Sequence, residues 1–210
     1  LLTGSSLHKE IVMTAGSLAY REKLPAYVVG GYVRDMLLGR VSSDIDIMVE
    51  GDGIAFAKKL AKKLKVNITV DYDRFGTALI PHPELEIEVA SARKEEYEPD
   101  SRKPKVIAST MEEDMSRRDF TVNAIAASIL PDTFGELYDP FGGLKDLQKG
   151  LIITPLDPDE TFSDDPLRML RAVRFAAQLK YNVASTALDS ISRNVKRMKI
   201  ISWERIRDEI

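Results

Sequence analysis

The chain has 210 residues, enough for one ordinary domain or for one domain with a smaller second one. Apolar residues make up 44% and charged residues 30% of it, which is typical of folded globular proteins and not of disordered ones. No run approaches the roughly 20 apolar residues of a membrane-spanning helix, and the first residues lack the layout of a secretory signal. We therefore expect a cytoplasmic protein with no membrane partner. The absence of cysteine excludes disulfides and thiolate metal sites.

Charge is distributed unevenly along the chain, whose net charge is −3. Residues 168–210 contain ten lysines and arginines against four acidic residues, so the rest of the chain is acidic. A basic segment can face phosphate groups while an acidic one holds cations. Ordinary solvated helix faces would produce the same asymmetry, so charge alone does not identify a nucleic-acid partner.

Hydrophobic periodicity divides the first half of the chain into helices and strands. In chain order it predicts a helix over 8–21, a strand over 27–29, a helix from 30 to about 38, a strand over 44–49, a helix over 53–64 and strands over 66–70, 77–80 and 85–90. The polar stretch 91–110, which contains Pro99 and Pro104, predicts a mobile loop.

The second half changes in character near Pro155. We expect a helix from 111 that breaks near Asp119 and resumes over 124–129, with Asp119 as the N-cap of the resumed part. Short elements at 137–138 and 151–153 precede helices over 166–179, over 185–194 and from 202 onward. The sequence therefore predicts a sheet-bearing domain over 1–155 and an all-helical one over 156–210. Because the last helical pattern runs to the final residue, we expect a C-terminal continuation.

Two aspartates stand two residues apart on the strand predicted over 44–49. Because side chains alternate along a strand, Asp44 and Asp46 share one face while Ile45 and Ile47 point to the core. Carboxylates about 7 Å apart repel each other unless a cation lies between them, and Mg²⁺ prefers such oxygen ligands. Surface strands also contain this pattern by chance, so neighbouring residues have to support a metal site.

A glycine pair precedes these aspartates at a strand-to-helix turn. The backbone N–H groups of Gly30 and Gly31 can approach a phosphate there, because a helix N-terminus favours anions. Arg34 is close enough in sequence to reach the same anion. A tight turn and a surface arginine would explain these residues alone. Beside a carboxylate pair, the phosphate-plus-metal interpretation is favoured.

A third carboxylate could come from the strand predicted over 85–90. Glu86 and Glu88 both face away from the core side there, and the pattern does not choose between them. A polar outer strand face would explain both equally well.

Arginines recur at steps of three on the helix predicted over 166–179. The stripe consists of Arg168, Arg171 and Arg174, and the apolar residues opposite it are Leu170, Val173 and Ala177. Aligned arginines repel one another, so we expect an anion or a carboxylate beside them, such as Asp164 or Asp165. A ladder of i,i+3 ion pairs is the alternative. Arg117 and Arg118 could place one more cation nearby, although structural roles would explain them too.

Four segments together resemble the motifs of class II tRNA nucleotidyltransferases and bacterial poly(A) polymerases. They read VGGYVRDMLLG at 29–39 with DID at 44–46, RRDFTVNAIA at 117–126, YDPFGG at 138–143 and DDPLRMLRAVRF at 164–175. Their shared order makes the resemblance specific. It implies an α+β, polymerase β-like head, with a mixed sheet and flanking helices, followed by an all-helical neck. The body and tail of that family would lie outside this chain.

The resemblance also implies roles for individual residues. Asp44 and Asp46 would bind two Mg²⁺ ions, and Glu88 would act beside them in catalysis. The implied nucleotide contacts are Gly30, Gly31, Arg34, Arg118, Asp165, Arg168, Arg171 and Arg174. In the two-metal reaction of the family, the ions activate the 3′-hydroxyl of an RNA primer and neutralise the leaving pyrophosphate.

Base selection can be argued from hydrogen bonding. Asp165 only accepts hydrogen bonds and Arg168 only donates them. Cytosine and adenine offer an exocyclic amine to the acid and ring acceptors to the arginine, whereas guanine and uracil present a carbonyl to the carboxylate. The pair can therefore admit CTP and ATP while rejecting GTP and UTP. Many CCA-adding members have glutamate where this chain has Asp164, so the set of nucleotides used stays open.

The sequence thus predicts a template-independent enzyme that extends RNA 3′ ends, with CCA addition to tRNA as the favoured interpretation. Addition of A alone, of CC or of poly(A) is the alternative within the family. A non-catalytic nucleotide- or RNA-binding module is the alternative from another class. A small-molecule nucleotidyltransferase would leave Arg118 and the helix arginines unexplained. The oligomeric state is not predicted.

Overall fold

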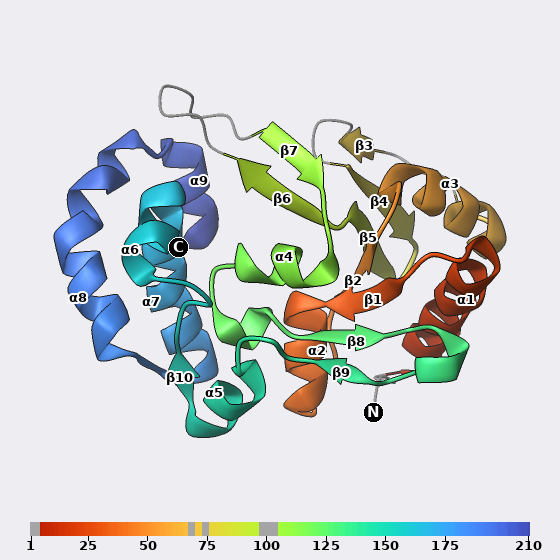
Figure 1. Cartoon of the computed structure of the whole chain (residues 1–210), viewed down its shortest axis with the longest axis horizontal. Helices are drawn as coiled ribbons and strands as arrows, with labels where there is room; N and C mark the ends of the chain where they lie inside the picture. The colour runs from red at the N-terminus through yellow and green to blue at the C-terminus, as the bar shows by residue number, and fades with distance from the viewer. Residues whose placement is uncertain (1–4, 67–69, 73–75, 97–104) are drawn as a thin grey trace. The chain divides into compact units, whose positions relative to one another are not determined.

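The computed structural model describes residues 5–66, 70–72, 76–96 and 105–210 (Figure 1). Packing divides the chain into two compact units, of which the first comprises residues 1–115 and 125–138. The second comprises residues 116–124 and 139–210. Packing therefore groups 116–124 and 139–155 with the C-terminal residues. The functional domain boundary at 155 stays a prediction.

The first unit is built on a mixed sheet, which has seven strands in the described part of the chain. Their order is β3-β4-β5-β2-β1-β8-β9, with β2 and β5 parallel and the other neighbours antiparallel. The strands are β1 Ala26–Val29, β2 Asp44–Val49, β3 Val70–Tyr72, β4 Thr77–His82, β5 Leu85–Ser91, β8 Ala126–Ser128 and β9 Leu137–Tyr138. The predicted mixed sheet is confirmed. Of the strand predicted over 66–70, residues 67–69 lie outside the described residues, and β3 begins at 70.

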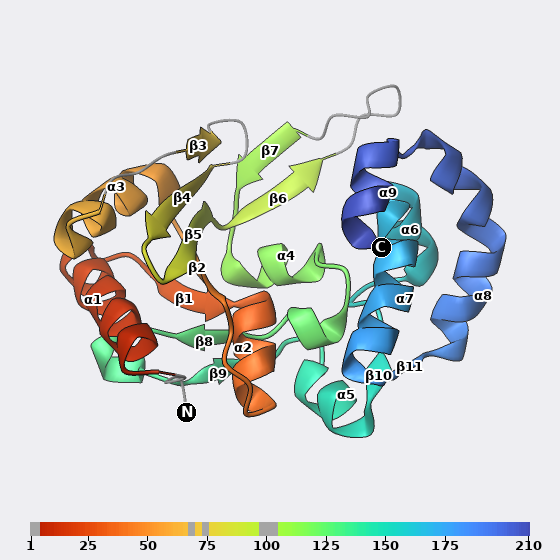
Figure 2. The same ribbon diagram turned by 180° about the vertical axis from the view of Figure 1, so that it is seen from behind.

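Two amphipathic helices, α1 Ser6–Glu22 and α3 Gly53–Leu64, lie side by side over one face of this sheet (Figure 2). The approach of α1 to the sheet is very close. A Cβ on Gly16 would stand 1.8 Å from the carbonyl oxygen of Ile129, so only glycine fits there. Both helices lie where hydrophobic periodicity predicts them.

Alternation along β2 and β5 gives the sheet one apolar face and one acidic face. The apolar side chains are Ile45, Ile47, Ile87 and Val89, which are buried on the side that α1 and α3 cover. The acidic side chains point the opposite way, and they are Asp44, Asp46, Glu86 and Glu88. The predicted division between core-facing isoleucines and outward carboxylates is therefore confirmed.

The mobile loop predicted over 91–110 is wrong at both of its ends. β6 Arg93–Glu96 pairs antiparallel with β7 Lys105–Ala108, in a two-stranded sheet of its own. Backbone hydrogen bonds hold such a pair without an apolar alternation that the sequence would reveal. Residues 97–104, including both prolines, lie outside the described residues.

The long helix predicted from 111 is also wrong in its second part. α4 Met111–Ser116 is helical, and a 3₁₀ turn follows at Thr121–Asn123. The chain then enters β8, which is fully buried beside β1. The alanine-rich run around β8 favours a helix locally, but pairing in the centre of the sheet overrides that preference. Asp119 consequently caps no helix over 124–129.

The second unit is mainly helical. Its elements are α5 Gly143–Lys149, β10 Leu151–Ile152, α6 Pro158–Asp164, α7 Leu167–Leu179, β11 Asn182–Val183, α8 Ser185–Asn194, a 3₁₀ helix at Val195–Ile200 and α9 Trp203–Glu209. α5 and α6 are short and were not predicted. The two-residue strands β10 and β11 pair in parallel. In the described part of this unit, β10 and β11 form the one pair of strands.

The apolar face of α7 differs from the predicted one. Val173 is 58% exposed and Ala177 is exposed. The buried residues of the helix are Leu167, Met169, Ala172, Phe175 and Leu179. The predicted apolar residues repeat at the helical period but lie on another face of α7, because periodicity alone does not show which face contacts the core.

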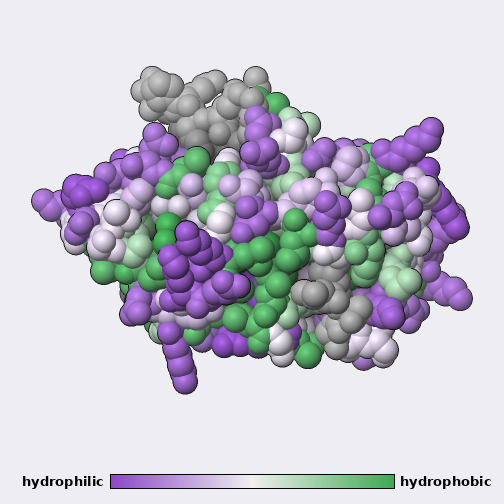
Figure 3. Space-filling view, turned by 60° about the horizontal axis from the view of Figure 1, so that its bottom comes forward, coloured by the Kyte–Doolittle hydropathy of each residue, from purple (hydrophilic) through white to green (hydrophobic). Residues whose placement is uncertain are grey.

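The surface is mixed. On the face drawn in Figure 3, apolar residues form patches that hydrophilic residues border. No helix in the described part of the chain is long and apolar enough to cross a membrane.

Candidate functional site

The acidic face of the first unit brings four carboxylates into register. β2 and β5 run parallel, and Asp44 stands opposite Glu86 while Asp46 stands opposite Glu88. Neighbouring strands lie about 4.8 Å apart, so each opposed pair places two like charges close together. Asp44 and Glu88 are exposed, and Asp46 is half-buried. The structure thus sets Glu88 beside Asp46 and Glu86 beside Asp44.

The chemistry of these donors fits a hard divalent cation. They offer carboxylate oxygens only, the ligands that Mg²⁺ prefers. Within the described ranges, no three acidic or histidine side chains are grouped closely enough to hold a metal by themselves. Mg²⁺ commonly binds one or two carboxylates and completes its coordination with water and substrate phosphates. Asp44 and Asp46 could hold such an ion, and metal binding by them and by Glu88 stays a prediction.

The glycine pair opens α2 Gly30–Leu37, a helix that contacts β1 and β2. Gly30 has a φ of 67°, in the left-handed region that favours glycine, and its N–H donates to the carbonyl of Ile125 at 3.2 Å. The place of a Cβ on Gly31 lies 3.6 Å from Nη2 of Arg34. The helix N-terminus and the guanidinium are therefore neighbours, as a shared anion site requires.

Arg34 is not the surface arginine of the alternative interpretation. Its residue is only 5% exposed, and Nε and Nη2 each donate to the carboxylate of Asp35 at 2.9 Å. Burial and the two-point ion pair fix the guanidinium beside the turn. Phosphate binding by Arg34 stays a prediction.

In the second unit, Arg171 lies at the centre of a charge cluster. Its Nε donates to Oδ2 of Asp119 at 2.8 Å, and its Nη1 donates to Oε1 of Glu209 at 3.0 Å. Arg174 forms an ion pair with the same Glu209, at 2.9 Å between Nε and Oε2. Asp119 and Glu209 thus supply carboxylates to Arg171 and Arg174, and the sequence had suggested neither of them for this role. Burial by itself would lower the pKa of Arg171, but the two carboxylates outweigh it and raise that pKa.

Asp119 also organises the turn that follows it. Its Oδ1 accepts the N–H of Phe120 at 2.8 Å and the side-chain amide of Asn123 at 3.0 Å. Arg118 donates from Nη1 to the carbonyl of Asn123 at 3.5 Å. The motif at 117–126 is therefore a folded turn tied to α7 through Asp119 and Arg171.

The two residues expected to recognise the base are both held by neighbours in their own unit. Oδ1 of Asp165 accepts the N–H of Leu167 at 3.2 Å, and Oδ2 accepts from Nη2 of Arg205 at 2.8 Å. Arg168 donates from Nη2 to the carbonyl of Arg117 at 2.6 Å and from Nη1 to that of Thr161 at 3.4 Å. These hydrogen bonds fix the orientation of the Asp165 carboxylate, which is an acceptor, and of the Arg168 guanidinium, which is a donor.

The sequence interpretation missed two residues of α9, Arg205 and Glu209. They are four residues apart, so they lie on one face of the helix. That spacing was visible in the sequence. It did not show which partners they bind, because Asp165 and Arg171 are far away along the chain.

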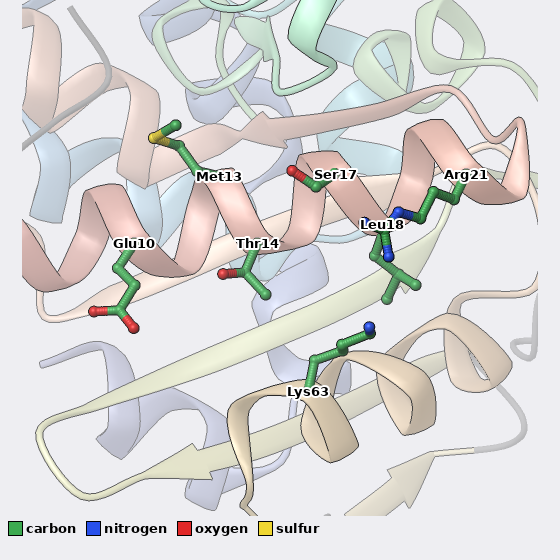
Figure 4. A pocket seen from close by; sticks show the side chains of 7 residues that line it. All are labelled: Glu10, Met13, Thr14, Ser17, Leu18, Arg21 and Lys63. Carbon is green, nitrogen blue, oxygen red and sulfur yellow. The ribbon is translucent and has the colours of Figure 1, made fainter.

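A groove lies elsewhere on the first unit, on its helical side. Figure 4 shows its lining, in which Lys63 of α3 points toward α1. The residues from α1 are Glu10, Met13, Thr14, Ser17, Leu18 and Arg21. Since α1 and α3 cover the apolar face of the sheet, this groove is on the side opposite to the four carboxylates. It is not part of the candidate site.

Comparison with known families agrees with this arrangement. The family described as "Poly A polymerase head domain" matches residues 26–153. The chain belongs to this family. The matched span contains the glycine turn, both aspartates, Glu88 and the turn after Arg118. The predicted family resemblance is confirmed.

Curated members of the wider group include two kinds of enzyme. An A-adding tRNA nucleotidyltransferase from Aquifex aeolicus is 45% identical over 161 residues, which cover 77% of this chain and 19% of that protein. An A-adding tRNA nucleotidyltransferase from Halalkalibacterium halodurans is 34% identical over 208 residues, 97% of this chain and 48% of that protein. A CCA-adding enzyme from Geobacillus kaustophilus is 37% identical over 192 residues, 90% of this chain and 45% of that protein. The chain spans half or less of the length of these relatives.

Solved structures confirm the fold. A CCA-adding enzyme in its apo form II matches with a TM-score of 0.86 and 36% identity, over 98% of this chain and 48% of that one. A tRNA nucleotidyltransferase complexed with a primer tRNA and an incoming ATP analog matches with a TM-score of 0.81 and 37% identity, over 93% of this chain and 54% of that one. The α+β head followed by a helical neck is therefore the fold of this chain.

Proposed function

We propose that this chain is the catalytic portion of a cytoplasmic tRNA nucleotidyltransferase, which extends the 3′ end of tRNA without a template. One observation carries the proposal, namely the register of Asp44, Asp46 and Glu88 on two parallel strands of a poly(A) polymerase head domain. Like charges opposed in this way are destabilising unless a cation offsets them. Nucleotidyl transfer that depends on divalent cations requires carboxylates that bind those cations, and the acidic face of the sheet supplies them.

The residues of the first unit would act on the phosphates. Asp44 and Asp46 would hold two Mg²⁺ ions, with Glu88 beside them. Bound Mg²⁺ would promote deprotonation of the primer 3′-hydroxyl and offset the charge of the leaving pyrophosphate. The N–H of Gly31 and the guanidinium of Arg34 would orient the triphosphate, while Gly30, whose N–H donates to Ile125, shapes the turn.

The residues of the second unit would recognise the base. Asp165 accepts a hydrogen bond from an exocyclic amine, and Arg168 donates to a ring acceptor. Arg205 already holds Oδ2 of Asp165, so the acceptor geometry is set before a nucleotide arrives. The guanidinium groups of Arg118, Arg171 and Arg174 add positive charge for the nucleotide. Pairing with Asp119 and Glu209 makes Arg171 chiefly an organising residue.

Addition of the terminal A is the step that we assign first. The relatives named above are A-adding or CCA-adding enzymes, and both kinds add A. Addition of the complete CCA is the second candidate. The observation that favours it is the Asp165–Arg168 pair, which suits the amine and ring acceptor of cytosine as well as those of adenine.

Primer extension tests both candidates. The purified chain is incubated with Mg²⁺ and with tRNAs that end before CCA, after C or after CC, each with CTP, ATP or both. A single A on the CC-ending tRNA supports the proposal, and added C residues on the shorter primers extend it to CCA addition. Long A tails would instead assign poly(A) addition. The primers are used at high concentration and low salt, because affinity for nucleic acid depends on the number of phosphate contacts and falls with salt.

Asp44→Ala provides the control. It should abolish incorporation and weaken Mg²⁺-dependent binding of ATP. A wild-type chain that binds ATP but incorporates nothing, even at high primer concentration, would favour a non-catalytic nucleotide-binding module.

A further inference from the structure

A buried histidine links the start of α1 to the loop that precedes β2. His8 is 5% exposed and stacks on the ring of Tyr32, with 5.9 Å between ring centroids and 24° between planes. Its Nδ1 lies 2.6 Å from Oγ of Ser5, and its Nε2 lies 3.1 Å from the backbone carbonyl of Ser42. The site described above does not use this residue.

The partners of the ring fix where its hydrogen stands. A carbonyl oxygen only accepts, so Nε2 of His8 must donate to Ser42. Oγ of Ser5 accepts the backbone N–H of His8 at 3.3 Å, and its own hydrogen is then directed to Nδ1. Burial raises the pKa of the Tyr32 phenol to about 12, so the ring stacked on His8 is neutral at physiological pH. The imidazole is therefore held on both nitrogens and on one face.

The held carbonyl belongs to the residue that touches Asp44. Oγ of Ser42 donates to Oδ1 of Asp44 at 2.6 Å, because a carboxylate oxygen accepts. A hydrogen bond to Oδ1 leaves Oδ2 to face a cation. Two bonds thus connect a buried imidazole to an exposed carboxylate at the start of β2.

We propose that His8 and Ser42 are positioning residues that orient Asp44 for metal binding. The inference rests on the proposed function, in which Asp44 is a metal ligand. Asp44 is exposed, so burial does not hold its side chain. Mg²⁺ requires a near-octahedral arrangement, and a carboxylate that rotates freely loses conformational entropy when it binds. Anchoring Ser42 at its carbonyl by His8 and Asp44 at Oδ1 by Ser42 removes that freedom beforehand.

Three variants separate positioning from folding. Ser42→Ala removes the bond to Asp44 and leaves the backbone in place. His8→Phe keeps a stacking ring but loses both nitrogen contacts. His8→Gln restores a donor that can reach the carbonyl of Ser42. Ser43→Ala is the matched control, since Ser43 is the exposed serine next to Ser42 in the same loop.

The first readout is the binding of Mn²⁺ alone to the whole chain, followed by the electron paramagnetic resonance of the free ion. We expect Ser42→Ala and His8→Phe to raise the Kd for Mn²⁺ about tenfold, the usual effect of removing a residue that orients a metal ligand. His8→Gln should recover most of the affinity, and Ser43→Ala should match the wild type. In primer extension, the Mg²⁺ concentration at half-maximal rate should shift similarly while KM for ATP stays within about twofold.

The second readout is independent of metal and of activity. His8 and His82 are the two histidines of the chain, so ¹⁵N NMR with His82→Gln as the assignment variant can report the hydrogen on Nε2 of His8. A hydrogen on Nδ1 instead would overturn the inference.

The outcomes distinguish the inference from the proposed function. If the wild type binds Mn²⁺ and extends tRNA while Ser42→Ala and His8→Phe bind Mn²⁺ as it does, only the inference fails. If His8→Phe does not fold, Ser42→Ala decides alone. If the wild type neither binds Mn²⁺ nor extends tRNA under any condition, the proposed function fails and the metal-positioning role fails with it, whatever NMR shows of the ring.

Discussion

The two units treat charge in opposite ways. In the first, strand register opposes Asp44 to Glu86 and Asp46 to Glu88, so like charges stand beside each other. In the second, Arg171 lies between two carboxylates, Asp119 and Glu209. The first arrangement gives up stability in the absence of a cation, whereas in the second each buried charge already has a partner of opposite sign. Under the proposed function, the carboxylates of the first unit are kept for a cation, whereas the charges around Arg171 neutralise one another within the second unit.

The largest expected effect comes from neutralising one carboxylate of the first unit. Asp46→Asn keeps the shape of the side chain and removes its charge. Incorporation should fall by about 10³-fold or more, as for removal of a catalytic group. The unfolding midpoint in urea without metal should stay the same or rise, because one like-charge pair is relieved.

Glu86→Gln is the matched variant, since it relieves the other opposed pair without touching a proposed ligand. It should stabilise the chain similarly and leave most of the incorporation. A clear loss of stability in Asp46→Asn would contradict the comparison, because the carboxylate would then be a structural group.

The next largest effect tests the charge cluster of the second unit, in which Arg171 pairs with Asp119 and Glu209. Arg171→Leu leaves Asp119, which is largely buried, without its cation, and Glu209 with Arg174 alone. We expect a loss of about 3 kcal/mol of unfolding free energy, within the range for breaking one side of a buried pair. Urea denaturation measures it.

Arg193→Leu is the control for that substitution. Arg193 also pairs with an aspartate, Asp159 at 2.7 Å, but the two side chains are 58% and 48% exposed. Solvent screening should therefore make its loss much smaller than that of Arg171→Leu. Equal losses for the two variants would show that the cluster around Arg171 is no more than a surface ion pair.

A smaller effect is expected when Mg²⁺ is added. A cation that binds only the folded chain stabilises it by RT ln(1 + [L]/Kd), about 1.4 kcal/mol at ten times Kd. Thermal unfolding should therefore shift upward with Mg²⁺ in the wild type and in Arg193→Leu. Asp44→Ala should lose the shift, and retention of a full shift would place the cation elsewhere.

The sequence predicted the features that depend on residues close together in the chain. It missed those that depend on contacts between residues far apart. The strand with Asp44 and Asp46 was predicted because alternation of side chains is local. The run 124–129 was predicted as a helix because its alanines favour one, and only the pairing of β8 with β1 makes it a strand. The pairing of β6 with β7 was missed because β6 consists of charged residues only and the apolar run of β7, Val106 to Ala108, is too short to identify a strand. In the same way, Asp119 could be read as a cap, but its partner Arg171 lies 52 residues away.

The same limit explains the residues that were missed. The sequence placed His8 at the start of a helix but did not reveal its partner, since its contact with Ser42 joins residues 34 apart. Local chemistry and the family resemblance therefore suggested the groups that are proposed to touch phosphate and metal. The residues that hold those groups in place came only from the fold, as with Arg205 and Glu209 of α9.

The smallest expected change in stability is that of Arg205→Ala. This variant tests whether Arg205 orients the carboxylate of Asp165 or only stabilises the fold. Its pair with Arg205 is at 2.8 Å, but the arginine side chain is 52% exposed and that of the aspartate 27%. Arg205→Ala should therefore cost no more than about 1 kcal/mol. Oδ1 would stay fixed by the N–H of Leu167, while Oδ2 would lose the donor that orients it. If Asp165 reads the exocyclic amine, discrimination of ATP against GTP should fall several-fold in Arg205→Ala, and the rate with ATP should fall less.

Arg207→Ala is the control, because Arg207 pairs with the exposed Asp208 on the same helix. Unchanged discrimination in Arg205→Ala would mean that the N–H of Leu167 alone orients the carboxylate of Asp165. The Arg205–Asp165 pair would then be structural, like the pairs of Arg171.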